Sequence, residues 1–148
     1  MIGVNKDYYE NKKNYSYKSL EWLLFNEKIN NVKINYAYYG KETIIQIYYN
    51  EYKVDGYDEE NKTVYEFNGC YFHGCQKCYG PMDVNKLGNK NMIDLYNKTI
   101  LKEQKIKENG YNVISIWECE YDETIKKVKK IKQNDKSDIH TQRYNNEQ

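Results

Sequence analysis

Two acidic residues stand where they could share a cation. Asp55 lies in Val-Asp-Gly-Tyr at the end of one β-type run, and Glu66 lies in the next run, with ten residues between the two acids. A carboxylate among Val, Tyr and Phe costs free energy unless it binds a cation or hydrogen-bond donors. Oxygen ligands of this kind suit Mg²⁺ or Mn²⁺. The alternative is that Asp55 and Glu66 are ordinary exposed acids in a chain that has 22 of them.

The four cysteines are spaced as metal ligands are. Cys70, Cys75 and Cys78 form a C-x4-C-x2-C segment rich in glycine, and Cys119 follows 41 residues later. Four thiolates match a structural Zn²⁺ site, in which a C-x2-C pair chelates from one turn. Two alternatives stay open. Cys119 could be a buried core thiol, and His73 could replace one cysteine as the fourth ligand.

A helix and a series of short strands must position the acids. Ser16 or Ser19 is a suitable N-cap, and leucines recur at helical spacing up to about Ile29. Alternating apolar patterns then predict four strands, at residues 32–39, 43–49, 52–57 and 63–67. We expect these strands to form an antiparallel meander, with a polar turn at residues 58–61. In the last strand, alternation places Val64, Glu66 and Asn68 on one face.

The second half of the chain predicts a helix, a strand and another helix. Residues 89–109 form an amphipathic helix, with Lys98, Lys102 and Lys105 on its solvent side and Gly110 after its end. The β-branched run at residues 111–117 predicts a central strand that enters the sheet by a crossover. A lysine-rich helix begins near residue 122. The fold class is therefore α/β (α+β), a mixed central β-sheet flanked by helices.

The same patterns predict the domain limits. Residues 1–15 are polar and are expected to form a flexible arm, and residues 16–132 form one domain. Residues 133–148 have almost no apolar content and are expected to be a disordered tail.

Two separated motifs carry a family resemblance. The segment Glu66-Phe-Asn-Gly-Cys-Tyr-Phe-His-Gly-Cys-Gln-Lys-Cys and the later segment Asn-Gly-Tyr-Asn-Val-Ile-Ser-Ile-Trp-Glu-Cys119 flank the long helix. Together they resemble the very-short-patch repair (Vsr) endonucleases and their homing-endonuclease relatives, within the PD-(D/E)XK nucleases. The resemblance covers roughly residues 52–120. It implies a restriction-endonuclease-like core with a zinc-stapled loop.

The resemblance implies roles for individual residues. Asp55 matches the family's metal-binding aspartate, and His73 matches its catalytic histidine. Glu66 and Asn68 follow the general PD-(D/E)XK pattern, with Asn68 in the place of the lysine. Glu21 is similar to an acidic active-site residue near the N-terminus of the family's fold.

The cysteines and two aromatic residues also have counterparts in the family. Cys70, Cys75 and Cys119 match its zinc ligands, and Cys78 matches the fourth with a shift of one residue. Tyr71 and Phe72 stand where the family has the aromatic pair that inserts into the DNA stack. The alternatives are that these rings cover the zinc site and that His73 only supports it.

These residues predict a Mg²⁺-dependent DNA endonuclease with structural zinc. In such an enzyme Asp55 and Glu66 hold the cation, His73 exchanges protons and Asn68 orients water or phosphate. The rival hypothesis is a catalytically inactive zinc-binding DNA module associated with a replication or mobile-element protein, which the missing lysine favours. A nuclease for RNA or branched DNA would use the same residues, and no feature of the sequence indicates the oligomeric state.

Composition limits the classes of partner. With 23 basic and 22 acidic residues, the net charge is +1, which excludes a histone-like binder. The one dense positive run is Lys126 to Lys132, which could contact phosphates or be a solvated helix face. Mean hydropathy is −1.06, so no membrane segment is expected. We also expect no small-molecule cofactor. The N-terminal sequence has no secretory signal, so we expect an intracellular, reducing compartment, the cytoplasm or nucleus.

Overall fold

The computed structural model describes residues 16–37 and 43–146, with side chains described up to residue 136. The predicted arm at residues 1–15 and part of the first predicted strand lie outside the described residues. The helices and strands are, in order, α2 (Tyr17–Asn30), β1 (Asn35–Tyr36), β2 (Thr43–Ile47), β3 (Asn50–Val54), β4 (Gly56–Asp58), β5 (Thr63–Asn68), α3 (Cys70–His73), β6 (Val84–Asn85), β7 (Lys90–Asn91), α4 (Met92–Glu108), β8 (Asn112–Trp117) and α5 (Glu118–Asn146).

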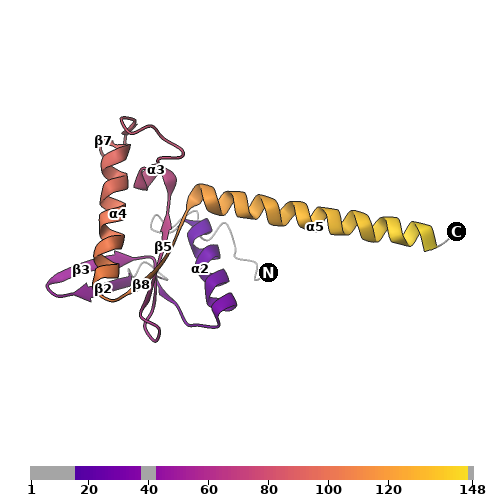
Figure 1. Ribbon diagram of the computed structural model, residues 1–148, viewed down its shortest axis with the longest axis horizontal. Coiled ribbons are helices and arrows are strands. Elements are labelled where there is room, and N and C mark those ends of the chain that lie inside the picture. Colours follow the sequence, from indigo (N-terminus) through magenta and orange to yellow (C-terminus); the bar gives the residue numbers. More distant parts are fainter. Residues whose placement is uncertain (1–15, 38–42, 147–148) are drawn as a thin grey trace.

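The main sheet is mixed and has the strand order β1-β4-β5-β8 (Figure 1). Strands β1, β4 and β5 pair antiparallel, whereas β5 and β8 pair parallel from Thr63↔Asn112 to Asn68↔Trp117. Helix α4 makes the crossover between the parallel strands, as parallel pairing requires. The carboxyl ends of β5 and β8 therefore meet at one edge of the sheet.

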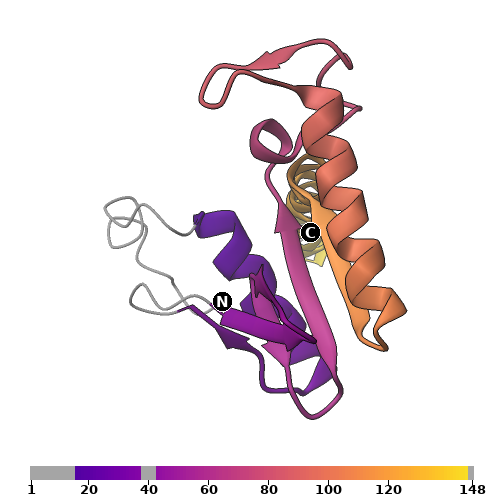
Figure 2. The ribbon, with the colours of Figure 1, turned by 90° about the vertical axis from the view of Figure 1, so that its left-hand side faces the viewer.

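Helices cover both faces of β5, as Figure 2 shows. On the α2 side, the core consists of Trp22, Leu23, Ile34, Tyr65, Phe67 and Tyr121. On the α4 side, it consists of Ile45, Ile47, Val54, Val64 and Ile106. The predicted class, a mixed central sheet flanked by helices, is confirmed.

Local sequence signals set several of the boundaries. Ser16 caps α2, because its hydroxyl accepts a hydrogen bond from the Ser19 N–H at 3.1 Å. Gly110 follows α4 with a φ of 84°, and its N–H donates to the Lys107 carbonyl, as a residue after a helix end does. Both signals were expected from the sequence.

The expected single meander is wrong at Asp55. The run predicted as one strand at residues 52–57 is divided into β3 and β4, and β3 pairs with β2 in a separate two-stranded sheet. Gly56 allows the break. A Cβ atom at Gly56 would lie 2.7 Å from Ile34 Cγ2 and 2.8 Å from Leu23 Cδ2, so only glycine fits against the α2 side.

Two other expectations fail in the second half of the chain. Strand β8 was predicted to be central, but it lies at the edge of the described sheet. None of its residues is fully buried: Val113 and Ile116 pack against the two core clusters, and Ile114 is exposed. The last helix was predicted to begin near residue 122 and to be followed by a disordered tail from residue 133. Helix α5 instead runs from Glu118 to Asn146, since residues 118–146 contain no Pro or Gly to end it.

Across the described residues, we find no helix with the length and apolar character needed to cross a membrane.

Candidate functional site

Alternation along β5 separates an apolar face from a polar one. Tyr65 and Phe67 point to the α2 side, where both rings contact Trp22 at centroid distances of 6.0 and 6.1 Å. Glu66 and Asn68 point to the α4 side. The alternation that the sequence predicted therefore places a carboxylate and an amide on the face that α4 covers.

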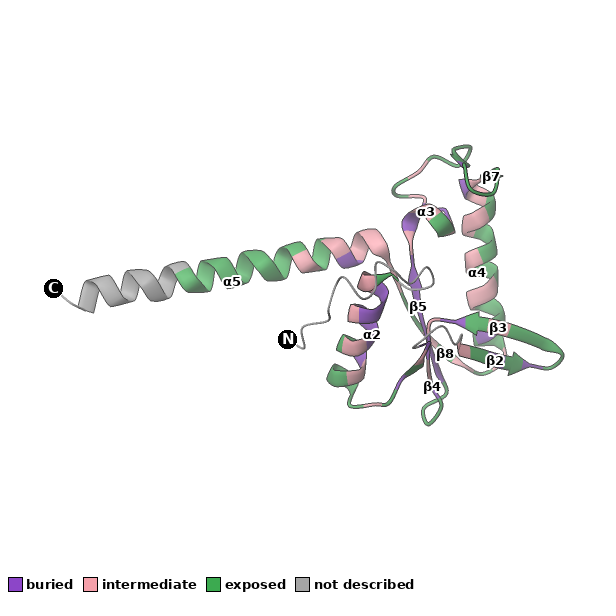
Figure 3. Ribbon diagram, turned by 180° about the vertical axis from the view of Figure 1, so that it is seen from behind, coloured by how far each residue is buried: buried purple, intermediate pink, exposed green. Residues whose placement is uncertain are grey.

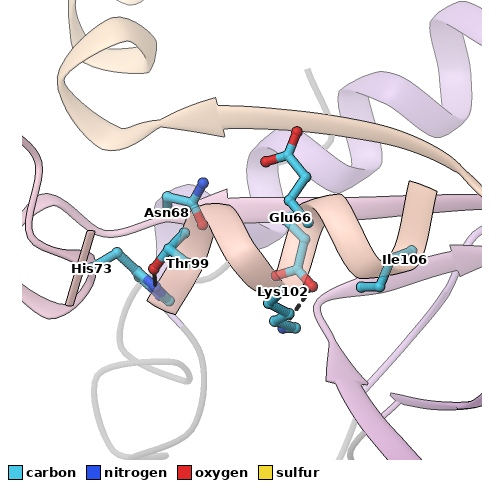
Figure 4. Close-up of a pocket in the computed structure, with 7 residues that line it drawn as sticks. Glu66, Asn68, His73, Thr99, Lys102 and Ile106 are labelled. Atoms are coloured by element: carbon cyan, nitrogen blue, oxygen red, sulfur yellow. Dashed lines mark hydrogen bonds and ion pairs between the residues drawn. The ribbon is translucent and has the colours of Figure 1, made fainter. Parts of the chain in front are cut away.

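A pocket lies between this polar face and α4 (Figure 4). Strand β5 contributes Glu66 and Asn68, and the end of α3 contributes His73. Helix α4 contributes four residues at positions i, i+3, i+4 and i+7, which is the spacing of one helix face: Thr99, Lys102, Glu103 and Ile106.

Glu66 and Lys102 form the central ion pair of the pocket. The Lys102 ammonium lies 2.8 Å from Glu66 Oε1, and it also donates to the Lys53 carbonyl. The Glu66 side chain is 11% exposed, and burial raises its pKa to about 7. Lys102 opposes that rise in pKa, and the charge of Asp55 adds to it. Glu66 is thus a carboxyl group that lacks sufficient positive charge around it.

Asp55 lies next to this pair at the junction of β3 and β4. Its Oδ2 accepts a hydrogen bond of 2.8 Å from the Phe67 N–H, just beyond the Gly56↔Tyr65 pair at which β4 begins. Burial raises the pKa of Asp55, while the Phe67 N–H and the charge of Lys102 oppose the rise. Lys102 therefore acts electrostatically on both carboxylates, and the two acids repel each other. Of the two acids that the sequence singled out, Glu66 lines the pocket, and Asp55 lies close enough for its charge to act on Glu66.

His73 is held in a defined state by α4. Its Nδ1 lies 3.0 Å from the Thr99 hydroxyl, which itself donates to the Leu95 carbonyl. Since that hydroxyl proton is already used, Thr99 accepts from Nδ1–H, and Nε2 keeps a free lone pair. Burial, with Lys102 and Lys98 nearby, lowers the pKa of His73 to about 4. His73 is therefore neutral near pH 7 and can accept a proton.

The four cysteines converge at the edge where β5 and β8 end. Their sulfur atoms all lie within 4.8 Å of one another: Cys70, Cys75, Cys78 and Cys119. Cys75 and Cys119 are 3.8 Å apart at Sγ, and all four are free thiols rather than disulfides. Four Zn–S bonds of about 2.3 Å in a tetrahedron would place sulfurs about 3.8 Å apart. The cluster can therefore hold a metal such as zinc.

The cluster's thiols differ in acidity, since burial raises the pKa of Cys70 and Cys119 whereas the pKa of Cys75 is lowered. Burial by itself would raise the pKa of Cys75, but the N–H groups of Lys77 and Cys78 lower it below its ordinary value. A deprotonated thiolate is the form that binds metal. His73 is not part of the cluster, since its Nδ1 contacts Thr99, so the alternative of His73 as the fourth ligand is wrong. Cys119 is a member, so the alternative of an unrelated core thiol is wrong too.

The other predicted site residues lie apart from the pocket. Glu21 is on α2 and accepts a hydrogen bond of 2.6 Å from the Tyr121 hydroxyl, on the opposite face of β5 from Glu66. The structure thus does not bring Glu21 to the two acids. Packing explains this placement, because Tyr121 lies against Phe67 at 5.6 Å.

The predicted aromatic pair has two different environments. Tyr71 lies against Tyr79, with ring centroids 5.9 Å apart, and its hydroxyl accepts a hydrogen bond from the Lys86 N–H. Tyr71 therefore ties α3 to the loop that precedes α4. Phe72 is 63% exposed, although its ring contacts Tyr71 at 5.7 Å. Only Phe72 presents its ring to solvent.

The sequence analysis missed all four α4 residues of the pocket, and Lys102 is the one that bears on its chemistry most. It was assigned to the solvent side of α4, but it points to Glu66. A usable signal was present in the sequence. Lys102 lies four residues before the fully buried Ile106 and three after Thr99, so the three residues share a helix face.

Comparison of the chain with protein-family models and with curated protein sequences finds no match.

Proposed function

We propose that this chain is a Mg²⁺-dependent DNA endonuclease with a restriction-endonuclease-like core and a structural zinc site. One observation carries the proposal: the 2.8 Å ion pair of Lys102 with Glu66, beside Asp55. A PD-(D/E)XK site needs two acids and a lysine, and Asn68 occupies the lysine position on the strand. Lys102 supplies the cationic group from α4 instead.

The acids fit a hard divalent cation. Two mutually repelling carboxylates with raised pKa values share a single ammonium group, so the pocket has room for further positive charge. Asp55 and Glu66 would hold Mg²⁺ or Mn²⁺ through oxygen atoms, as these ions prefer. When bound, the ion supplies positive charge against a phosphate and acidifies water.

The chain's own residues supply the remaining chemistry. Lys102 can donate to a non-bridging phosphate oxygen and stabilise the charge that develops as the bond to the 3′ oxygen breaks. His73, neutral with a free Nε2, can take a proton from the attacking water. Asn68 is buried in the same pocket and can orient that water or the phosphate through its amide.

The cysteine cluster would position this machinery. It joins the segment after β5 to the first turn of α5, and His73 lies within the segment that it closes. We infer that the bound metal is zinc and that its role is structural, because four thiolates leave no position for water or substrate. Phe72, exposed beside His73, would contact the DNA bases.

Plasmid nicking tests the function. Wild-type protein purified with zinc should convert supercoiled DNA to nicked and linear forms with Mg²⁺, and the Asp55→Ala and Glu66→Ala variants should not. Lys105→Ala is the matched control, since Lys105 is exposed on the same helix. Metal-dependent cutting that persists in both acid variants would refute the proposal.

The rival function, an inactive zinc-binding DNA module, predicts a different metal stoichiometry. Such a module binds zinc at the cysteines but has no second, weaker divalent site at Asp55 and Glu66. Isothermal titration of the zinc-loaded protein with Mn²⁺ separates the two functions. Lys102 removes the main argument for the rival, which was the missing lysine.

A further inference from the structure

Helix α5 leaves the body of the protein after its first two turns, as Figures 1 and 3 show. Tyr121 is buried against the α2-side core, and Ile125 packs on the same cluster. From Lys126 to Lys136 every side chain is exposed. This stretch of α5 does not contribute to the core, so its composition must have another physical explanation.

Five lysines lie within seven consecutive positions of this stretch: Lys126, Lys127, Lys129, Lys130 and Lys132. No acidic residue occurs between Ile125 and Asn134. At 3.6 residues per turn, the first four lysines fall within an arc of about 160°. Ile125, Val128 and Ile131 fall on the opposite side of the helix. We call the four residues Lys126, Lys127, Lys129 and Lys130 the lysine face.

Four lysines of the body have counter-ions among the described side chains, and the lysine face has none. These lysines form ion pairs with acids of the body or of the first turns of α5: Lys18, Lys77, Lys102 and Lys107. Among the described side chains, none forms an ion pair with the lysine face. Its members repel one another at i+3 and i+4 spacing, as Lys126 and Lys130 do. Each such pair lowers the stability of the helix by roughly 0.2–0.5 kcal/mol. A negatively charged partner would remove that cost.

We propose that the lysine face of α5 binds the phosphate backbone of duplex DNA, giving affinity that does not depend on sequence. The inference rests on the proposed function for its partner, but it concerns a surface outside the pocket. From Lys126 to Lys130 the helix rises about 6 Å, and a duplex carries about three or four phosphate charges over that axial length, against the four charges of the lysine face. The charge densities of the two surfaces therefore match.

The apolar side of α5 argues against a membrane as the partner. In the exposed stretch, the apolar side chains are Val128 and Ile131. Helices that lie in a membrane interface bury a broad apolar face that includes Trp, Phe or Leu. Two aliphatic residues do not provide such a face.

The salt dependence of binding tests the proposal. The full chain would carry Lys126, Lys129 and Lys130 changed to Gln, in an Asp55→Asn background without added Mg²⁺, so that cleavage does not interfere. Fluorescence anisotropy with a labelled duplex of arbitrary sequence gives the affinity between about 50 and 200 mM salt. Each lost phosphate contact reduces the slope of log K against log salt by about 0.9, so we expect a slope shallower by about 2 to 3.

Two further variants make the result specific. Changing Lys28, Lys33 and Lys105 to Gln removes the same net charge from exposed body positions. The slope of this variant should differ from that of the parent by no more than about 0.9, the value of one phosphate contact. Changing the three α5 lysines to Arg keeps the charge and should restore the slope. Equal slopes for the two Gln triples would overturn the proposal.

Two other measurements separate this proposal from its alternatives. Binding to phosphatidylserine vesicles that exceeds binding to the duplex, and that the α5 Gln triple abolishes, would overturn the proposal in favour of a membrane. If the parent chain fails to cleave DNA but still shows the α5-dependent slope, the proposed function fails while the DNA surface on α5 is supported.

Discussion

Strand β5 presents two different surfaces to the helices on either side of it. Toward α2, Tyr65 and Phe67 lie in a cluster of aromatic rings whose contacts serve stability. Toward α4, Glu66 and Asn68 share a face with the apolar Val64, and Glu66 pairs with Lys102. Neighbouring residues on one strand thus have opposite energetic characters. Burial of the first set stabilises the fold, whereas burial of Glu66 opposes its ionisation.

The largest expected effect is on the α2 side. Phe67→Ala removes a ring that packs against Trp22 and Tyr121, and it should lower the free energy of unfolding by about 3–5 kcal/mol. Urea unfolding followed by tryptophan fluorescence measures this loss. Phe72→Ala, which removes an exposed ring, should change stability by no more than about 0.5 kcal/mol. Similar losses for the two variants would contradict the assignment of the core.

The next effect is on the α4 side and concerns activity. Lys102→Met keeps the length of the side chain but removes the ammonium group, and it should lower the cleavage rate about 10²–10³-fold, equivalent to about 3–4 kcal/mol. Lys105→Met, on the exposed side of α4, should retain most activity. Single-turnover cleavage of plasmid DNA measures both rates. A Lys102→Met variant with the parental rate would show that Lys102 only supports the structure.

A smaller effect concerns Glu66, whose substitution should increase stability instead of lowering it. Because the pKa of Glu66 is raised to about 7, the folded state holds this proton more tightly than the unfolded state does. The ionised carboxylate therefore costs stability, and the cost develops as the pH rises from Glu66's ordinary pKa to about 7. Glu66→Gln should raise the free energy of unfolding at pH 8 by roughly 1–2 kcal/mol, with little gain at pH 4.

Urea midpoints at the two pH values, without divalent ions, test this effect of Glu66. The control is Glu60→Gln, an exposed residue of the turn between β4 and β5, which should not change stability at either pH. A Glu66→Gln variant less stable than the parent at pH 8 would mean that the Lys102 pair outweighs the cost of burial.

The smallest expected effect tests whether Glu21 contributes to stability and not to the chemistry of the pocket. Tyr121→Phe removes the 2.6 Å hydrogen bond to Glu21 but keeps the ring against Phe67, so it should cost about 0.5–1.5 kcal/mol of stability. Cleavage per folded molecule should stay at the parental rate. Thermal unfolding and nicking assays on the same preparation measure stability and cleavage rate. A loss of activity without loss of stability would indicate that Glu21 belongs to the active site.

Much of the fold was predictable because local signals specify it. Ser16 begins α2, Gly110 follows α4, and alternation in residues 63–68 assigns Glu66 and Asn68 to one face. Strand order was not predictable in the same way. The apolar run in β8 has the composition of a buried strand, so its residues do not reveal that it lies at the edge of the described sheet, where none of them is fully buried.

Spacing along the chain by itself determined the cysteine cluster. Three of its ligands lie within nine residues, and chelation from one loop is a local property that spacing expresses. The fourth ligand joins because β5 and β8 run parallel and end together. Only tertiary structure decided the carboxylate pocket, since it depends on the rotation of α4 that turns Lys102 to Glu66. The sequence shows that residue 102 carries a positive charge, but only the packing of α4 on β5 determines that Glu66 is its counter-ion.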